Sequence, residues 1–280
     1  ELKFENAIIA TGSIIANIPS LNINSKRLLN STTALDLPEI PKSLLVIGGG
    51  YIGLELGSVY QSLGSKVSVV EMMPFLLPGA DRDLVSFLSK RIKENFDKVM
   101  LNSRLVDMKE TKKGISVKIK GEDGKTTEEV YDYVLMSIGR KPDTKGLGLE
   151  NTKVKTNERG WIVVDSQLRT DDTNIFAIGD IVGEPMLAHK ASHEGRTAVE
   201  VIAGHKSVFE PRAIPAVVFT DPEIAWAGLT ETQAKEKNVD YKIVKFPWAA
   251  SGRATTLGRN DGVTKLIVDP KTERLLGIGI

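Results

Sequence analysis

The sequence has 280 residues, more than one ordinary domain needs, so two or three domains are expected. An apolar fraction of 41% is enough for hydrophobic cores, and a formal charge of +1 gives no reason to expect nucleic acid or an anionic membrane as a partner. The absence of cysteine excludes disulfides, thiolate metal sites and cysteine nucleophiles within this sequence, and no apolar run reaches the roughly 18 residues that cross a bilayer.

The two ends of the sequence have the pattern of a piece of a longer protein. It begins at Glu1 without a methionine and enters a strand pattern at residues 6–10. It stops at Ile280 inside another strand pattern. We therefore expect a chain truncated at both ends, so the lack of a targeting segment carries no information. Residues 14–41 contain three prolines and little periodicity, which predicts a connecting segment.

Residues 44–71 carry the strongest pattern in the sequence. An apolar strand at 44–47 leads into a glycine turn, a helix follows at 52–63, and a β-branched strand at 66–70 ends at Glu71. Glycines with a strand before them, a helix after them and an acid at this distance predict a dinucleotide-binding βαβ unit. The alternative is a glycine-rich turn without a ligand.

Each glycine of this turn has its own mechanical role. Gly48 lets the chain leave the strand through a tight turn, and Gly50 leaves room for a pyrophosphate. Gly53 allows the helix to pack closely on the strand. The N–H groups and the dipole at the helix start then favour the phosphate charge.

The acid at the end of the second strand indicates which nucleotide binds. Glu71 lies at the distance from which a carboxylate reaches the adenosine ribose hydroxyls. A 2′-phosphate would meet a like charge there, and Met72 and Met73 follow in place of arginines. The sequence therefore favours NAD over NADP.

Two helices near this unit have apolar stripes. Asp81 has the position of an N-cap for a second helix, which ends near Phe96. In residues 105–131, apolar and polar residues alternate as in an antiparallel meander. The stripe of the first helix consists of Ile52, Leu56, Val59 and Leu63, and that of the second of Leu84, Val85, Leu88 and Ile92.

The character of the sequence changes after a further helix at about 190–203. Short strands are expected at 214–220, 241–247 and 263–269. They surround a helix that the capping box Thr230–Gln233 opens. We interpret this α+β piece as a separate domain, with dimerisation as its role.

Several stretches together resemble a known family. They follow the family's order over nearly the whole chain: ATGS from Ala10, GGGYIGLELGSVYQSLG, Val70-Glu71, SIGRKP from Ser137, FAIGDIVGEPMLAHKASHEG, VVFTDPEIAWAGLTE and FPWAASGRA. On these motifs the sequence resembles the flavoprotein disulfide reductases, the class I pyridine nucleotide-disulfide oxidoreductases. Within that family it is most similar to the members that oxidise dihydrolipoyl groups.

The resemblance implies an α/β fold with Rossmann-like FAD- and NAD(P)-binding domains, in which the NAD domain is inserted into the FAD domain and an α+β dimerisation domain follows. Residues 1–37 and 141–210 would belong to the FAD domain, and residues 38–140 would form the NAD domain. Residues 211–280 would form an incomplete dimerisation domain.

The resemblance also implies which residues bind FAD. Thr11, Gly12 and Ser13 match the contact to FAD at a strand end, and Asp180 matches the acid that hydrogen-bonds the ribityl chain. The segment whose backbone meets the flavin ring at a helix start consists of Met186, Leu187, Ala188 and His189. Alternatively, Asp180 is only a turn residue. The alternative for His189 is a residue of the first helical turn that has no role in proton transfer.

On the NAD side the resemblance adds residues to the glycine turn. Tyr51 would cover the flavin face until nicotinamide enters, or would pack under the turn. Glu55, one helical turn later on the same face, would lie close to nicotinamide. The remaining matched positions are Gly49, Ile52, Leu105, Ile138, Gly139 and Arg140, of which Arg140 either contacts the cofactor or caps the domain junction.

Parts of the family pattern are missing. The Cys-x4-Cys pair, the His–Glu pair and the first FAD-binding glycine fingerprint are not in this sequence, which contains no catalytic residue and no metal ligand that we identify. We therefore expect an incomplete FAD site and no dithiol chemistry from the chain alone.

The implied whole protein is an NAD-dependent dihydrolipoyl oxidoreductase. It would be a homodimer that serves the lipoyl domains of 2-oxo-acid dehydrogenase or glycine cleavage complexes, in the bacterial cytoplasm or the mitochondrial matrix. The alternatives are a soluble nicotinamide nucleotide transhydrogenase of the same superfamily and a free-standing NAD-binding module.

Overall fold

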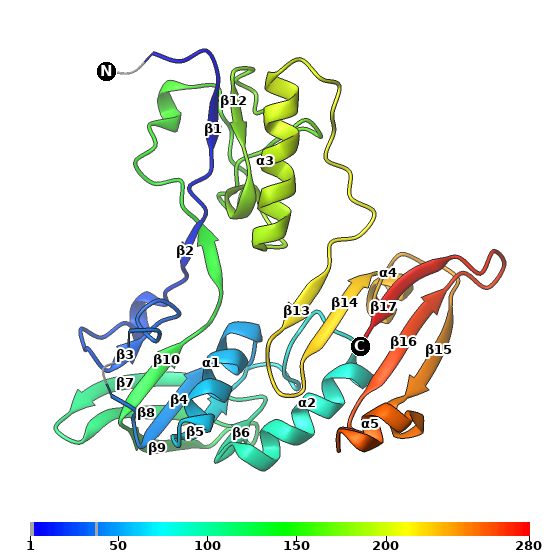
Figure 1. The fold of residues 1–280 in the computed structure, drawn as a ribbon. Coiled ribbons are helices and arrows are strands. Elements are labelled where there is room, and N and C mark those ends of the chain that lie inside the picture. The colour runs from blue at the N-terminus through cyan, green and yellow to red at the C-terminus, as the bar shows by residue number, and fades with distance from the viewer. Residues whose placement is uncertain (1–2, 37–38) are drawn as a thin grey trace. The chain divides into compact units, whose positions relative to one another are not determined.

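The computed structural model describes residues 3–36 and 39–280. The chain divides into two compact units, each built from separate stretches of sequence (Figure 1). The first unit consists of Glu1–Ala16 and Arg140–Ile214, and the second of Asn17–Gly139 and Pro215–Ile280. The expected domain boundary at residue 37 lies outside the described residues.

The second unit contains a parallel sheet with the strand order β3-β10-β4-β5-β6. The sheet consists of β3 (Leu28–Leu29), β4 (Ser43–Ile47), β5 (Lys66–Val70), β6 (Lys98–Met100) and β10 (Tyr133–Met136). These strands are runs of apolar residues because both faces of the sheet are covered. The segment predicted as a connection, residues 14–41, contributes the two-residue strand β3 to this sheet.

The two faces of this sheet pack against different layers. Leu44 and Val46 of β4 point into a core shared with the helices α1 (Tyr51–Ser62) and α2 (Arg82–Asn95). Leu45 and Ile47 point into a core with the antiparallel meander. The meander consists of β7 (Arg104–Thr111), β8 (Gly114–Lys120) and β9 (Thr126–Tyr131), as the alternation predicts.

The buried faces of the two helices differ in how well the sequence predicts them. The expected stripe of α2 is buried in full. That of α1 is wrong at Val59 and Leu63, which are exposed, whereas Leu56 packs partly buried against the core. The residues buried on this helix are Gly53, Leu54, Gly57 and Tyr60. Because α1 lies close to β4 through glycines, its contact face carries few apolar side chains that a stripe could reveal.

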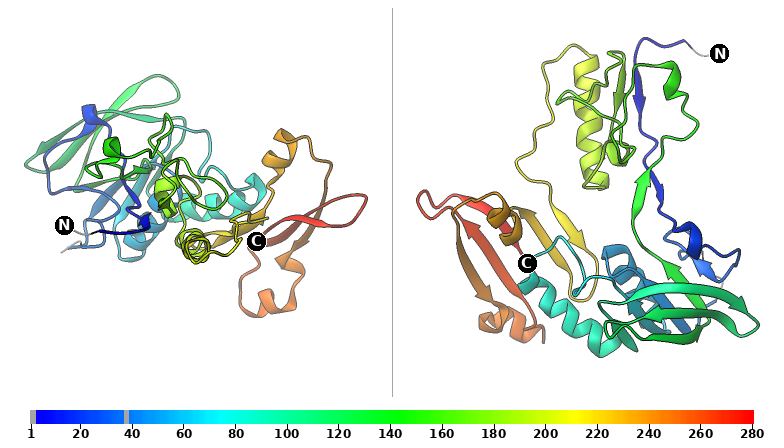
Figure 2. Two further views of the ribbon diagram at one scale, coloured as in Figure 1. Left: turned by 90° about the horizontal axis from the view of Figure 1, so that it is seen from above. Right: turned by 180° about the vertical axis from the view of Figure 1, so that it is seen from behind.

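The C-terminal part of the second unit is an antiparallel sheet with the order β13-β14-β17-β16-β15 (Figures 1 and 2). Its strands are β13 (Ala216–Val218), β14 (Ile224–Gly228), β15 (Lys242–Pro247), β16 (Val263–Val268) and β17 (Leu275–Gly279). The helices α4 (Glu231–Glu236), opened by the predicted capping box, and α5 (Gly252–Thr256) connect them. This sheet packs on α2, since Val218, Ile224 and Val263 share a core with Leu84 and Leu88.

The first unit is built around α3 (Ala188–Ile202). The parallel pair β1 (Ala7–Ile9) and β12 (Ile175–Ala177) packs on this helix through Phe176 (Figures 1 and 2). The strands β2 (Ser13–Ile15) and β11 (Arg140–Pro142) form an antiparallel pair. Within the described ranges of both units, no helix combines the length and apolar character needed to cross a membrane.

Candidate dinucleotide and flavin sites

The glycine turn lies at the carboxyl end of β4, where the chain enters α1. Gly48 has a φ of +106°, and a Cβ atom there would lie 2.5 Å from the backbone oxygen of Ser137. The Ser137 hydroxyl donates a hydrogen bond of 2.9 Å to the carbonyl of Ile47. The predicted tight turn at Gly48 is therefore confirmed, and any side chain there is excluded by both conformation and space.

Gly53 and Gly50 lack side chains for different reasons. A Cβ atom at Gly53 would lie 2.2 Å from the carbonyl oxygen of Gly48 and 2.9 Å from Val46, so α1 can approach β4 this closely through glycine alone. At Gly50, which precedes the first turn of α1, a Cβ atom would meet nothing within 4 Å. The open space at the start of a helix, where backbone N–H groups point outward, fits a phosphate.

Glu71 lies beside the glycine turn, at the carboxyl end of β5. Its carboxylate accepts hydrogen bonds from the backbone N–H of Gly49, at 2.7 Å, and of Met73, at 2.8 Å. These bonds hold the acid at the edge of the turn, where the sequence places the ribose. A carboxylate has about four acceptor positions, so it can accept from ribose hydroxyls in addition.

Glu55 has a partner that local sequence patterns do not reveal. Its Oε1 atom accepts a hydrogen bond of 2.8 Å from the backbone N–H of Phe219, at the end of β13. Tyr51, one turn earlier on α1, is 41% exposed. The Glu55 carboxylate, which is expected near nicotinamide, is thus hydrogen-bonded to the C-terminal part of the chain within the same unit.

Two other residues assigned to the nucleotide site, Leu105 and Ile138, lie on the meander side of the parallel sheet. Leu105 is buried in the core beneath the meander, and Ile138 packs against that core. Gly139 has a φ of +111° and open space around it. Arg140 lies outside this group, because it belongs to the first unit.

In the first unit, Arg140 contacts Ser13, one of the residues assigned to the flavin. Its guanidinium donates to the hydroxyl and the carbonyl of Ser13, each at 2.6 Å. The Ser13 hydroxyl in turn donates to Oδ2 of Asp180 at 2.5 Å. Thr11 bonds the carbonyl of Asp143 at 2.9 Å, and Gly12 has a φ of +71°. The arrangement holds the Asp180 carboxylate at the end of β12, where it can accept from a polyhydroxyl chain.

A buried ion pair on α3 supports the turn that carries Asp180. The Lys190 ammonium lies 2.8 Å from Oε1 of Glu194, and both side chains are almost fully buried. Oε2 of Glu194 accepts from the backbone N–H of Gly179 at 2.7 Å, and Lys190 donates to the carbonyls of Gly179 and Gly183. The pair therefore connects both ends of the turn to the helix.

Met186 and Leu187 precede α3 and are half-buried, while Ala188 and His189 form its exposed first turn. These four residues occupy a helix start, as the sequence predicts for the segment beside a flavin ring. Sequence reasoning did not identify Lys190, Glu194 or Ser137 as contributors. The i, i+4 spacing of the lysine and the glutamate was visible, but this spacing is also common on exposed helix faces.

Comparison with known proteins identifies the family. Residues 1–195 match the family model described as pyridine nucleotide-disulphide oxidoreductase, and residues 214–280 match the dimerisation domain of that family. The chain belongs to the pyridine nucleotide-disulphide oxidoreductases. The expected fold class and family resemblance are thereby confirmed.

Relatives in this family include dihydrolipoyl dehydrogenases. The enzyme of Vibrio parahaemolyticus is 48% identical over 276 residues, which are 99% of this chain and 58% of the relative. That of Geobacillus stearothermophilus is 47% identical over 277 residues, again 99% of this chain and 58% of the relative. The chain thus spans less than two thirds of the length of these relatives.

Solved structures of the family have the same fold. The HOCl-induced flavoprotein disulfide reductase RclA from Escherichia coli is similar with a TM-score of 0.89 and 32% identity, over 99% of this chain and 63% of that one. LpdA from Mycobacterium tuberculosis is similar with a TM-score of 0.88 and 31% identity, over 97% of this chain and 59% of that one. Flavoproteins of this family use FAD and NAD(H).

Proposed function

We propose that this chain is part of an FAD-dependent oxidoreductase that oxidises dihydrolipoyl groups and transfers a hydride to NAD. The observation that carries this proposal is the built glycine turn with the Glu71 carboxylate beside it. The identity of 48% with a dihydrolipoyl dehydrogenase, over 99% of the chain, supports the choice of reaction. A soluble nicotinamide nucleotide transhydrogenase of the same superfamily stays the alternative.

The described residues provide most of a site for NAD and part of a site for FAD. The second unit offers NAD an open helix start at Gly50 and a ribose acceptor at Glu71. The first unit offers the flavin Asp180, Ser13 and the start of α3, a part of a site. When bound, FAD accepts electrons from a dithiol and delivers a hydride to NAD.

In this proposal the chain's own residues bind and orient. The helix start of α1 holds the pyrophosphate charge, and Glu71 selects a ribose with free hydroxyls. Asp180 holds the ribityl chain, and the start of α3 places positive dipole potential near the flavin ring. Tyr51, Ile52, Glu55, Leu105, Ile138 and Gly139 complete the NAD site, and Thr11, Gly12, Met186, Leu187, Ala188 and His189 the described part of the FAD site.

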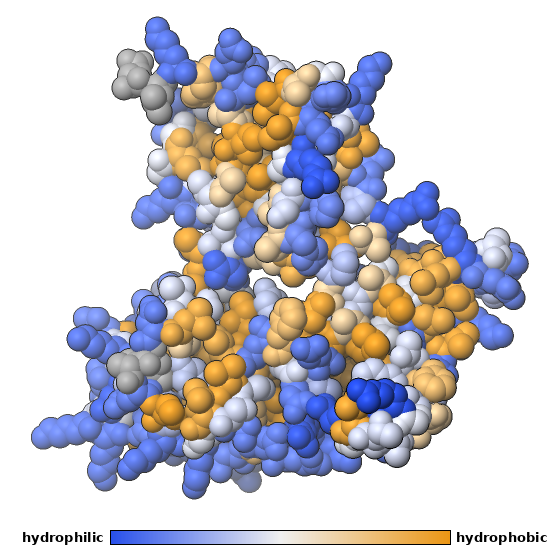
Figure 3. All heavy atoms as spheres, viewed as in Figure 1, coloured by the Kyte–Doolittle hydropathy of each residue, from blue (hydrophilic) through white to orange (hydrophobic). Residues whose placement is uncertain are grey.

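The C-terminal sheet supports the proposed homodimer. It exposes Val244, Phe246, Leu275 and Ile278, and Phe219 is exposed directly after β13. Figure 3 shows hydrophobic side chains gathered over this sheet. Exposed apolar groups of this kind mark interaction surfaces. We keep the domain division 1–37, 38–140, 141–210 and 211–280 as a proposal; the compact units differ from it, since residues 17–36 belong to the second unit and Arg140 to the first. We also keep the lipoyl domains as partners, and the bacterial cytoplasm or the mitochondrial matrix as the location.

The nucleotide preference tests the proposal directly. We expect the wild-type chain to bind NAD more tightly than NADP, and Glu71→Arg to weaken NAD by roughly tenfold to a hundredfold, because a charged hydrogen bond contributes about 1.5–3 kcal/mol. The ratio of the two dissociation constants should shift toward NADP. Isothermal titration calorimetry with both nucleotides measures this ratio.

Glu71→Gln is the matched control. Its amide oxygen can still accept from the N–H of Gly49, but its NH2 group cannot accept from Met73, so the negative charge and one of the two bonds to the backbone are lost. The glutamine variant should therefore bind NADP better than the wild type does, and should lose about 1 kcal/mol of stability. A wild-type chain that binds no NAD, or an unchanged NAD to NADP ratio in Glu71→Arg, contradicts the proposed function.

A further inference from the structure

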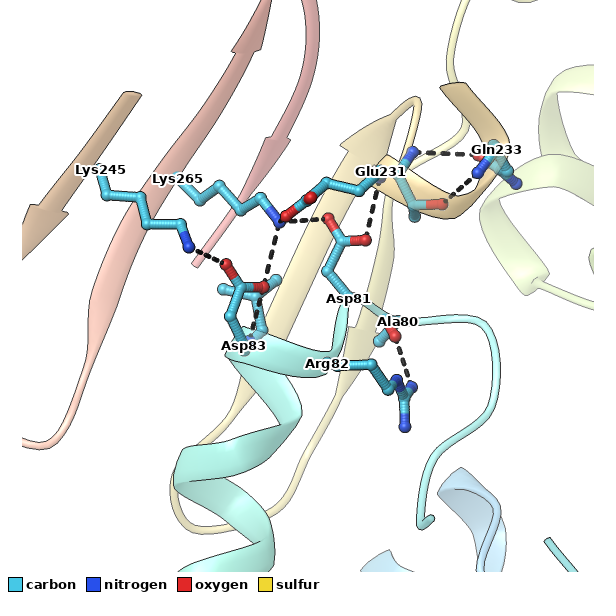
Figure 4. Close-up of polar contacts among 10 residues, drawn as sticks. Ala80, Asp81, Arg82, Asp83, Glu231, Gln233, Lys245 and Lys265 are labelled. Atoms are coloured by element: carbon cyan, nitrogen blue, oxygen red, sulfur yellow. Dashed lines mark hydrogen bonds and ion pairs between the residues drawn. The ribbon is translucent and has the colours of Figure 1, made fainter. Parts of the chain in front are cut away.

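A buried ionic cluster lies where α2 meets the C-terminal sheet in the second unit (Figure 4). Its centre is the ammonium of Lys265 on β16, whose side chain is 1% exposed. The ammonium lies 2.8 Å from Oδ2 of Asp81 and 3.0 Å from Oδ1 of Asp83, and it also bonds Glu231 at the start of α4. The carboxylates of these three acids lie within 4.8 Å of one another, so the lysine supplies the cation that allows them to share one site.

Charge pairing in this cluster outweighs the cost of burial. Burial acts to lower the pKa of Lys265, but hydrogen bonds to Asp81, Glu231 and Asp83 raise it above its ordinary value. Burial acts to raise the pKa of Asp83, but its bonds to Lys245 and Lys265 lower it below the ordinary value. Both shifts favour the charged forms of Lys265 and Asp83.

Asp81 is diverted from the role that its position predicts. It is the N-cap residue of α2, yet its side chain makes no capping hydrogen bond to that helix. One carboxylate oxygen contacts Lys265, and the other accepts from the backbone N–H of Glu231 at 2.9 Å. A residue type that normally caps its own helix here joins that helix to the C-terminal sheet.

The next residue, Arg82, organises the loop between β5 and α2. Its guanidinium donates to the carbonyls of Leu76, at 2.8 Å, and Leu77, at 2.6 Å, and to that of Ala80. It also lies over the ring of Phe75, 4.3 Å from the centroid. One side chain thus fixes three carbonyls of the loop, and its own backbone is held in place by the contacts of Asp81.

This loop is bonded to the glycine turn. The backbone N–H of Leu77 donates to the carbonyl of Gly49 at 2.8 Å, and Gly49 donates to Glu71 at 2.7 Å. Leu76 is buried against the turn, because a Cβ atom at Gly49 would lie 2.7 Å from its side chain. The contacts are therefore continuous from Lys265 through Asp81, Arg82 and the loop to the turn.

We propose that Lys265 is a positioning residue for the dinucleotide site: by holding Asp81, it fixes the loop that supports the glycine turn, and so couples the C-terminal sheet to NAD binding. The inference rests on the proposed NAD site. It means that a residue of the C-terminal sheet, far from the glycine turn in the sequence, contributes to nucleotide affinity.

The experiment compares two lysines of the same cluster. Lys265→Met removes the ammonium that contacts Asp81, whereas the control Lys245→Met removes one that contacts Asp83, at 2.6 Å, and that lies on an exposed side chain. Lys265→Met should weaken NAD binding about tenfold, a typical size for coupling between sites, and Lys245→Met should change it less than twofold. Hydrogen exchange at the amides of Leu77 and Gly49 should become faster in the first variant and stay unchanged in the second.

A second variant guards against misfolding. Asp81→Asn keeps an oxygen that accepts from Glu231 but loses the charge that Lys265 contacts, so it should change affinity and amide exchange in the same direction by a smaller amount. Folded Lys265→Met or Asp81→Asn with unchanged affinity and exchange overturns the proposal, and global unfolding of both variants overturns it as well, since the cluster would then serve stability alone. If the wild type binds no NAD, the proposed function fails, while the exchange at Leu77 and Gly49 still decides whether Lys265 positions the turn.

Discussion

Gly53→Ala is expected to destabilise the second unit by about 3 kcal/mol or more, at the upper end of what overpacking costs. The added methyl group would lie 2.2 Å from the carbonyl oxygen of Gly48 and 2.9 Å from Val46. A backbone oxygen in a tight turn cannot move as the end of a flexible side chain can, so α1 must shift away from β4. Because folded domains are stable by about 5–15 kcal/mol, this is a large fraction of the total. Guanidinium unfolding followed by circular dichroism measures the loss.

Gly50→Ala is the matched control on the same turn. Its φ of −78° suits alanine, and a Cβ atom there meets nothing within 4 Å. We expect a loss of stability of no more than about 1 kcal/mol, the typical cost of placing alanine at an N-cap. NAD binding should nevertheless fall, because the methyl group occupies the space for the pyrophosphate. Equal stability of the Gly53→Ala and wild-type proteins would contradict the close packing of α1 on β4.

Lys190→Met is expected to destabilise the first unit by about 3–5 kcal/mol, the cost of leaving one partner of a buried ion pair without its counter-charge. The side chains of Lys190 and Glu194 are 6% and 3% exposed, so water cannot replace the lost ammonium without opening the core. Hydrogen exchange in peptides that cover 175–202 should report the change. Exchange in the second unit serves as the internal reference.

The double variant Lys190→Met with Glu194→Gln separates charge from packing. The glutamine oxygen can still accept from the N–H of Gly179, and no uncompensated charge remains in the core. Most of the lost stability should therefore return, with protection at Gly179 close to that of the wild type. If the double variant is as unstable as Lys190→Met, the destabilisation comes from lost packing of the lysine stem and our explanation is wrong.

The sequence predicts the architecture where local patterns carry the information. The βαβ unit at 44–71, the meander at 105–131 and the apolar stripe of α2 agree with the structure because strand period, helix period and turn glycines are local signals. The roles of Gly48 and Gly53 follow from the same turn chemistry. The family resemblance adds the domain types, and the comparisons confirm the family.

The features that the sequence does not predict depend on distant partners. The bond from Phe219 to Glu55 joins residues 164 positions apart, so no window of the sequence contains it. Asp81 correctly marks the start of α2, but its side chain contacts Lys265 and Glu231 in place of its own helix. The buried face of α1 is missed because it consists partly of glycines. The assigned roles of the NAD and FAD residues stay predictions until ligands are bound.

The ionic cluster also has a consequence for synthesis on the ribosome. Asp83 and Lys265 lie 182 residues apart, so the acids at the start of α2 are made long before their counter-charge. At about 5–20 residues per second, the interval is on the order of 10 to 40 s. Once β10 has been made as well, the nascent chain has every strand of the parallel sheet and the helices α1 and α2, but not the β16 lysine that contacts Asp81 and Asp83. The core between α2 and the C-terminal sheet therefore forms only after that sheet has been translated. A chaperone that binds in this interval would meet α2 with its sheet-facing side uncovered.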